Sequence, residues 1–282
     1  MQSASDNGHP DLGATPLAFA PRLAFSGLAV VALGAGVLAS GVAVGTVDSL
    51  LVIVMALVVT QIGWATIWHG VAGVAWRQPL AELRAWPART LVRPLPYTQP
   101  GSAAEKTALA LGHLRDWANA RLLPQYGALL AGLVGAVIVG LVMSLVLGPQ
   151  PAALTLGAVL LTQVALLVCR ANGQPHALFG GLMWVGLPLL MGYALFQSVT
   201  LDVVLVAVGL SMAYAGTDSA PRARGWWLAG AGVVLVLLVA TRRPLGAFAI
   251  AVLALPQLLL VPSRHIKVWL MAMRLAAAIA IS

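Results

Sequence analysis

Charged side chains are scarce in this sequence. Only 9% of its 282 residues are charged, as 16 Lys or Arg and 8 Asp or Glu, while 60% are hydrophobic. A soluble domain is about a quarter charged and about half apolar, so this composition excludes a cytosolic enzyme. The chain can bury so much apolar surface only in lipid, which predicts an all-α fold, a polytopic transmembrane helical bundle.

Cysteine and the motifs of soluble catalysts are also nearly absent. The single cysteine, Cys169, excludes an intrachain disulfide. There is no HExxH motif or Cys/His cluster for zinc, no glycine-rich nucleotide loop and no nucleophile elbow. The net charge of +8 comes mostly from basic residues in short loops, where they act as topology signals and contact membrane lipids. We therefore expect no nucleic-acid partner.

Long apolar runs fill the chain after a polar tail over residues 1–21. The tail has no basic segment ahead of an apolar core, so no cleavable signal peptide is expected. A helix needs about 20 apolar residues to cross the hydrocarbon core. Two pairs of small residues spaced four positions apart, Gly36 with Ser40 and Gly41 with Gly45, predict close helix packing. About nine spans are expected in a single bundle over 22–282, at 23–45, 48–72, 124–148, 151–170, 177–197, 199–216, 225–242, 244–262 and 265–281.

The basic residues are unevenly divided between the two sides of these spans. Thirteen of the 16 fall on the N-terminal side or in the loops that follow even-numbered spans. The positive-inside rule then places the N-terminus in the cytoplasm of a bacterium, with the chain in the inner membrane. The long loop at 73–123 is cytoplasmic in this topology. Its residues 102–120 predict an interfacial amphipathic helix, because Ser102 and Glu105 fit a capping box.

Three local features, in order, resemble the UbiA superfamily of intramembrane prenyltransferases. The second span ends in QIGWATIWH at residues 61–69, which is similar to the family's second helix before its first acidic motif. The tripeptide Arg93-Pro94-Leu95 is similar to an Arg-Pro-Leu that follows that motif, and residues 180–192 resemble the fifth helix. The resemblance implies a nine-helix UbiA-like fold and an isoprenoid substrate or ligand.

The acidic residues of that family are missing here. Its members hold two Mg²⁺ ions between two Asp-rich motifs, and hard cations of this kind require oxygen ligands. The corresponding stretch, 68–76, contains no Asp, Glu or Asn, with His69 and Ala72 where the first two aspartates would stand. The loop after the sixth span offers only Asp218. Mg²⁺ is therefore expected only if the chain is enzymatic.

The leading hypothesis is a divergent, non-catalytic UbiA-like protein that binds or scaffolds an isoprenoid-tailed lipid, a quinone or a (bacterio)chlorophyll, as a subunit of a larger membrane complex. The candidate cofactor-binding residues are His69, Trp64, Trp68 and Arg93. The first alternative is an active prenyltransferase that attaches a prenyl or phytyl chain to an aromatic or tetrapyrrole acceptor, using His69, Arg93 and Asp218. The second is a transporter of small apolar solutes.

Each of these residues also has a structural interpretation. His69 can serve as an axial ligand to a pigment magnesium or as a hydrogen-bonding residue at a helix end. Arg93 can bind phosphate or contact anionic lipid. Arg274 lies inside an apolar run, so it must either reach the interface or pair with a partner membrane subunit.

Overall fold

A computed structural model describes residues 27–42, 45–72, 76–86, 101–169, 177–216 and 223–240, and these are helical with short connections and no strand. The predicted all-α class is confirmed for this part of the chain. The elements are α1 (Gly27–Ala39), α2 (Val47–Val58), η1 (Val59–Trp64), α3 (Ala65–Ala72), α4 (Arg77–Ala85), α5 (Ala103–Trp117), η2 (Ala118–Leu122), α6 (Leu123–Leu147), α7 (Pro149–Cys169), α8 (Ala177–Gly181), η3 (Leu182–Gly186), α9 (Leu187–Ala194), α10 (Leu201–Ala215) and α11 (Ala223–Ala240).

Within the described ranges, each of the first seven expected spans overlaps a helical segment. Four segments are long and apolar enough to cross a membrane: Val47–Ala72, Ala103–Leu147, Pro149–Val168 and Ala177–Ala194. Three apolar helices are shorter, at Gly27–Ala39, Leu201–Ala215 and Leu228–Leu237. The expected spans at 244–262 and 265–281, the tail 1–21 and Arg274 lie outside the described residues.

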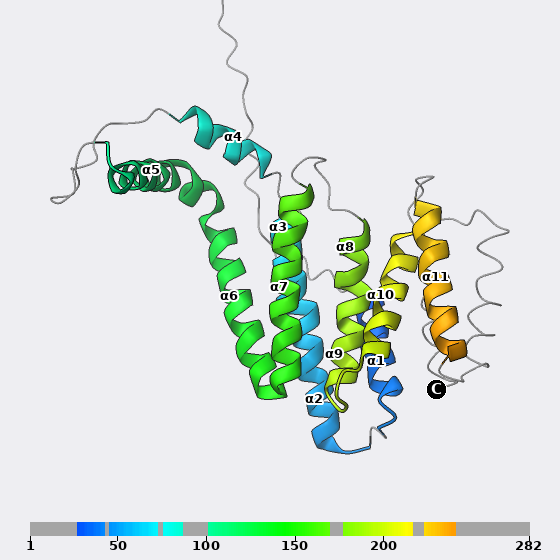
Figure 1. The fold of residues 1–282 in the computed structure, drawn as a ribbon. Helices are drawn as coiled ribbons and strands as arrows, with labels where there is room; N and C mark the ends of the chain where they lie inside the picture. The colour runs from blue at the N-terminus through cyan, green and yellow to red at the C-terminus, as the bar shows by residue number, and fades with distance from the viewer. Residues whose placement is uncertain are drawn as a thin grey trace, which may run out of the picture.

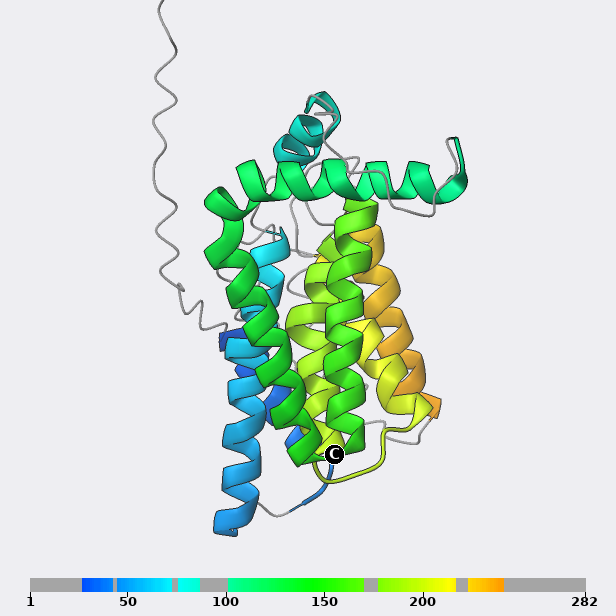
Figure 2. The ribbon, with the colours of Figure 1, turned by 90° about the vertical axis from the view of Figure 1, so that its left-hand side faces the viewer.

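The helices run alternately up and down, and two further helices lie across one end (Figures 1 and 2). In Figure 1, α4 and α5 lie above the bundle, whereas the turn between α6 and α7 lies at its lower end. We call these the α4–α5 end and the α6–α7 end. The helix pairs in most extensive contact are α10 with α11, α1 with α9 and α6 with α7.

A single residue joins α6 to α7. Gly148 has φ 131°, a backbone conformation that an L side chain rarely adopts, and its N–H donates to the carbonyl of Ser144 at 3.1 Å. Pro149 follows as the first residue of α7, where its missing N–H leaves no hydrogen bond unmade. This tight turn fixes α7 directly beside α6.

The amphipathic helix predicted at 102–120 is present as α5. The Ser102 hydroxyl accepts from the backbone N–H of Glu105 at 3.2 Å, and the Glu105 carboxylate accepts from the N–H of Gly101. Helix α5 lies across the direction of the spans, and the chain turns through η2 into α6 without leaving the helix (Figure 2). The interfacial helix and the third span are therefore one continuous element rather than two separated by a loop.

Three π-helical turns interrupt the spans and were not predicted. η1 divides the second span, η2 precedes α6, and η3 divides the fifth span. Each π turn holds an extra residue compared with an α turn, and such turns are frequent at functional sites. Because η1 and η3 contribute Val59, Trp64 and Met183 to one buried cluster, two of the three meet in the same core.

Glycine allows α1 and α9 to pack backbone to backbone. A Cβ on Gly36 would overlap the carbonyl oxygen of Leu189, and one on Gly192 would overlap that of Leu33. The expected role of Gly36 in close packing is thus confirmed. That of Gly41 and Gly45 is wrong: both follow the end of α1, Gly41 has φ 71°, and a Cβ on either would meet nothing within 4 Å.

Candidate functional site

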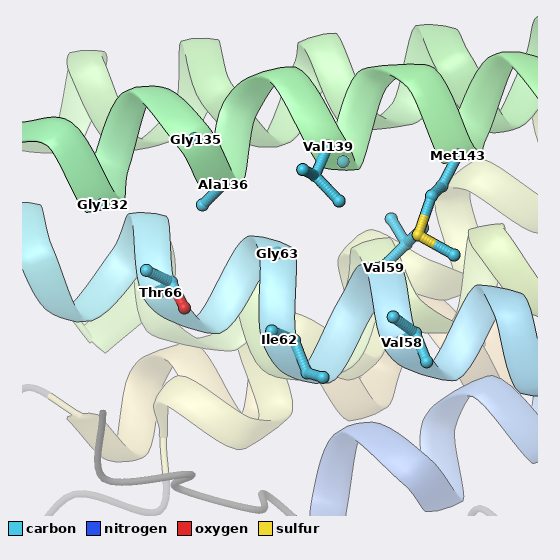
Figure 3. A pocket seen from close by; sticks show the side chains of 11 residues that line it. Val58, Val59, Ile62, Gly63, Thr66, Gly132, Gly135, Ala136, Val139 and Met143 are labelled. Carbon is cyan, nitrogen blue, oxygen red and sulfur yellow. The ribbon is translucent and has the colours of Figure 1, made fainter. Parts of the chain in front are cut away.

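An apolar groove of about 240 Å³ runs between the second span and α6 (Figure 3). Thr66 is its one polar lining residue. Gly63 on one wall and Gly135 on the other leave space where side chains would otherwise meet. The lining residues are Val58, Val59, Ile62, Gly63, Thr66, Gly132, Gly135, Ala136, Val139, Gly140 and Met143.

The two glycines differ in how much space surrounds them. A Cβ on Gly63 would lie 3.7 Å from the Cα of Gly140, an ordinary van der Waals contact, whereas a Cβ on Gly135 would meet nothing within 4 Å. Ile62 is 48% exposed and Val139 is 56% exposed. The groove therefore opens to the outside of the bundle, which faces hydrocarbon when the helices cross a membrane.

A chain of buried hydrogen bonds lies beside the groove. The Trp64 indole N–H donates to the Thr155 hydroxyl at 3.3 Å. The hydroxyls of Thr155 and Ser144 lie 2.6 Å apart, and Ser144 donates to the carbonyl of Gly140 at 2.6 Å. Because the Ser144 proton is committed to Gly140, Thr155 must donate to Ser144. The chain therefore runs in one direction and joins η1, α7 and α6 behind the groove.

The structure separates the three candidate residues of the second span. Trp64 is 1% exposed and Trp68 is 6% exposed, and both belong to a core cluster. His69 is exposed, and its ring lies 5.6 Å from that of Trp184 in η3, centroid to centroid, at 41°. None of these three residues lines the groove. Of the three, only His69 keeps a face that a ligand can reach.

Trp184 and the Thr155–Ser144 pair were missed as parts of this region. No sequence signal distinguishes Trp184 from the other eight tryptophans. Thr155 lies 91 residues from Trp64 along the chain. Only the packing of α7 against the second span reveals that pairing.

Arg93 and Asp218 lie outside the described residues, so neither can be placed relative to His69. Among the residues that the structure does describe, no three His, Cys, Asp or Glu side chains gather as a metal site requires. Asp48 and Asp202 are in the first turns of α2 and α10, at the α6–α7 end (Figure 1). They are therefore remote from His69, which is in the last turn of α3.

Basic side chains gather at the opposite end. Every Lys or Arg whose side chain the structure describes belongs to α4, α5 or η2: Arg84, Lys106, Arg115 and Arg121. The acidic side chains Glu82, Glu105 and Asp116 belong to α4 and α5 as well, so this end is distinguished by holding all the described Lys and Arg side chains. Helix α5 lies across the direction of the spans, as expected for a helix at a membrane surface (Figure 2).

No protein-family model, no curated protein and no solved structure matches the chain. What the protein does must therefore be inferred from the groove, from the residues around it and from the distribution of basic residues between its two ends.

Proposed function

We propose that the protein is an integral membrane protein that holds the apolar chain of an isoprenoid-tailed lipid in the groove between the second span and α6. The observation that carries this proposal is the lining. Ten of the eleven groove residues are apolar, and two exposed rim residues, Ile62 and Val139, open the groove toward hydrocarbon. A chain of isoprene units can enter sideways from the bilayer and lose no hydrogen bond in doing so.

The dimensions of the groove favour a narrow chain over a ring. Its volume of about 240 Å³ is smaller than the ~300–1,000 Å³ of typical small-molecule pockets. It follows α6 from Gly132 to Met143, which is roughly 17 Å at about 1.5 Å per residue. A quinone or (bacterio)chlorophyll ring would then lie outside the groove, where His69, exposed beside Trp184, is our candidate contact.

The proposed scaffold is a divergent UbiA-like bundle of nine spans without the Mg²⁺–diphosphate machinery, serving as a lipid-holding subunit of a larger membrane complex. Two observations support this part of the proposal. The described helices alternate in direction as that topology requires, and residues 68–72 carry no acidic side chain. Fold similarity alone does not establish an activity, so the choice of an isoprenoid rather than another apolar chain comes from the resemblance.

The proposed orientation places the α4–α5 end in the cytoplasm of a bacterium, with the N-terminus on the same side. The support is the distribution of basic residues: the described Lys and Arg side chains all belong to α4, α5 and η2, and none of them lies at the other end. Basic residues in short cytoplasmic segments set the orientation of inner-membrane proteins.

The test compares two glycine substitutions on one helix. In both Gly135→Leu and Gly127→Leu, the new Cβ meets nothing within 4 Å, so neither creates a clash at that atom. Both raise helix propensity equally. Only Gly135 lines the groove, so only its isobutyl group takes the place of a bound chain.

We expect wild-type protein and Gly127→Leu to retain a long-chain quinone or a phytyl-tailed pigment through purification, as measured by mass spectrometry of the extracted lipid. Gly135→Leu should retain at least about tenfold less. Equal retention by the two variants, or no isoprenoid lipid bound by wild-type protein even when it is added, contradicts the proposal. Mg²⁺-dependent product from labelled prenyl diphosphate would contradict its non-catalytic part.

A further inference from the structure

One hydroxyl within the described helices makes no hydrogen bond. Thr66 is half-buried in α3, and its side chain pairs with no other described residue. Every other Ser or Thr side chain inside a described helix has a partner, in most cases a carbonyl of the preceding turn. These are Ser49, Thr60, Thr107, Ser144, Thr155, Thr162 and Ser211.

The surroundings of Thr66 explain what this hydroxyl lacks. A threonine in a helix ordinarily bonds to the carbonyl four residues earlier. For Thr66 that carbonyl belongs to Ile62 in η1, and it accepts from the backbone N–H of Ala65. In hydrocarbon an unpaired hydroxyl is costly, because no water replaces the missing partner. The Thr66 hydroxyl therefore favours an acceptor that another molecule brings.

The unpaired hydroxyl lies at one end of the groove. Figure 3 shows Thr66 and Gly132 together at this end, with Val58 and Met143 at the other. The second span ends at Ala72 before α4, and α6 follows α5, so Thr66 marks the end of the groove nearer to the α4–α5 end (Figure 1). His69 is three residues further along α3, one turn beyond Thr66 on the same side of the helix.

The position of this one donor defines the ligand that fits best. A wholly apolar chain would leave the hydroxyl unpaired, and an acceptor far along the chain would lie among apolar side chains. The best complement is an apolar chain with an oxygen acceptor where the chain joins its head. Prenylated quinones have a ring carbonyl next to the carbon that carries the chain, and phytyl-tailed pigments have an ester carbonyl at the corresponding point.

We propose that the Thr66 hydroxyl donates a hydrogen bond to the carbonyl oxygen at the junction of chain and head. Thr66 is then the residue that determines both which group the groove recognises and the direction in which the ligand lies. The head extends past Thr66 toward His69 and the α4–α5 end, and the chain runs toward Met143. This inference rests on the proposed function and adds the recognised group and the direction to it.

The experiment uses the full chain in detergent, loaded with a geranylgeranyl menaquinone that is isotopically labelled at the carbonyl next to the chain. Infrared difference spectroscopy reads the labelled band, because a hydrogen bond lowers the stretching frequency of a carbonyl. Thr66→Val keeps the shape of the side chain and removes the hydroxyl, so the labelled band should move to higher frequency. The dissociation constant should rise about threefold to tenfold. Thr66→Ser keeps a hydroxyl and should restore the wild-type band.

Thr60→Val is the matched control on the same span. The Thr60 hydroxyl donates to the carbonyl of Ala56 at 2.9 Å, and Thr60 does not line the groove. This variant should show the wild-type band and affinity, and circular dichroism must show that all variants are folded. A parallel measurement with chlorophyll labelled at its phytyl ester carbonyl distinguishes the two sources, because only a ligand whose labelled band moves in Thr66→Val places that carbonyl at Thr66.

The outcomes separate this inference from the proposed function. Labelled bands that stay unmoved in Thr66→Val for both ligands, while Gly135→Leu still reduces lipid retention, would overturn recognition by Thr66 and leave the groove as the binding site. A response of the menaquinone carbonyl on the far side of the ring, in place of the labelled one, would overturn the proposed direction. Equal retention by Gly135→Leu and Gly127→Leu would instead contradict the groove itself.

Discussion

The contact between α1 and α9 should fail when a methyl group is placed at Gly36. A Cβ there would lie 2.7 Å from the backbone nitrogen of Tyr193 and would overlap the carbonyl of Leu189. Ordinary contact begins at 3.4 Å, so the two backbones must separate by at least about 0.7 Å, the difference between 3.4 and 2.7. The obstructing atoms are backbone and cannot rotate away. Gly36→Ala should therefore destabilise the bundle.

A neighbouring glycine isolates the size of this effect. Gly34 lies on the same helix, and a Cβ there would meet nothing within 4 Å. Both substitutions gain the same helix propensity, about 1 kcal/mol, so this contribution cancels between them. Overpacking of a well-packed contact costs about 1–3 kcal/mol. We therefore expect Gly36→Ala to be less stable than Gly34→Ala by about 1–3 kcal/mol.

The assay is reversible unfolding in mixed micelles, followed by tryptophan fluorescence. Gly192 offers a second check, because its Cβ would lie 3.0 Å from the nitrogen of Val37 across the same contact. A single displacement of α9 relieves both overlaps, so Gly36→Ala combined with Gly192→Ala should cost less than the sum of the two. Equal stability of Gly36→Ala and Gly34→Ala would refute this account of the α1–α9 contact.

Three further predictions concern single side chains. Trp64→Phe removes the donor to Thr155 and should lower the free energy of unfolding by about 0.5–1.5 kcal/mol; an unchanged value would contradict the buried hydrogen-bond chain. Ser102→Ala removes a helix cap worth about 1 kcal/mol, so amide exchange should accelerate in the first turn of α5 and stay unchanged in the spans. His69→Phe keeps the ring contact with Trp184 and should change the free energy of unfolding by less than about 0.5 kcal/mol. The same substitution should reduce the bound quinone or pigment detected by absorbance, because His69 is the proposed contact of the ligand's ring.

The spans themselves were predictable because one physical constraint, the thickness of hydrocarbon, sets their length. The run expected at 124–148 is helical at Leu123–Leu147, and the one expected at 151–170 is helical at Pro149–Cys169. The interfacial helix was predictable for a different reason. Ser102 and Glu105 cap it through atoms three residues apart, so the signal is entirely local.

The candidate site was less predictable because its determinants are contacts between distant segments. Trp64 and Trp68 were assigned to ligand binding, yet they pack in the core, since α7 and the fifth span fill the space around them. Nothing in the local sequence distinguishes Gly36, which contacts α9, from Gly41, which lies in a turn. The groove is similarly hidden, because Gly63 and Gly135 form it only after two spans have paired.

The π turn at η1 bears on how this chain tolerates insertions and deletions. Deleting one residue from Val59–Trp64 would restore ordinary α-helical spacing, which is intrinsically the more favourable hydrogen-bond geometry. The remainder of the span, however, would rotate by about 100°, the angle per residue of an α-helix. The His69 ring would lose its contact with the Trp184 ring, and Gly70 would no longer lie against the side chain of Leu133. A deletion that restores regular α-helical hydrogen bonding would therefore misalign the residues that line the groove. We expect the protein to tolerate substitutions in η1 far more readily than insertions or deletions.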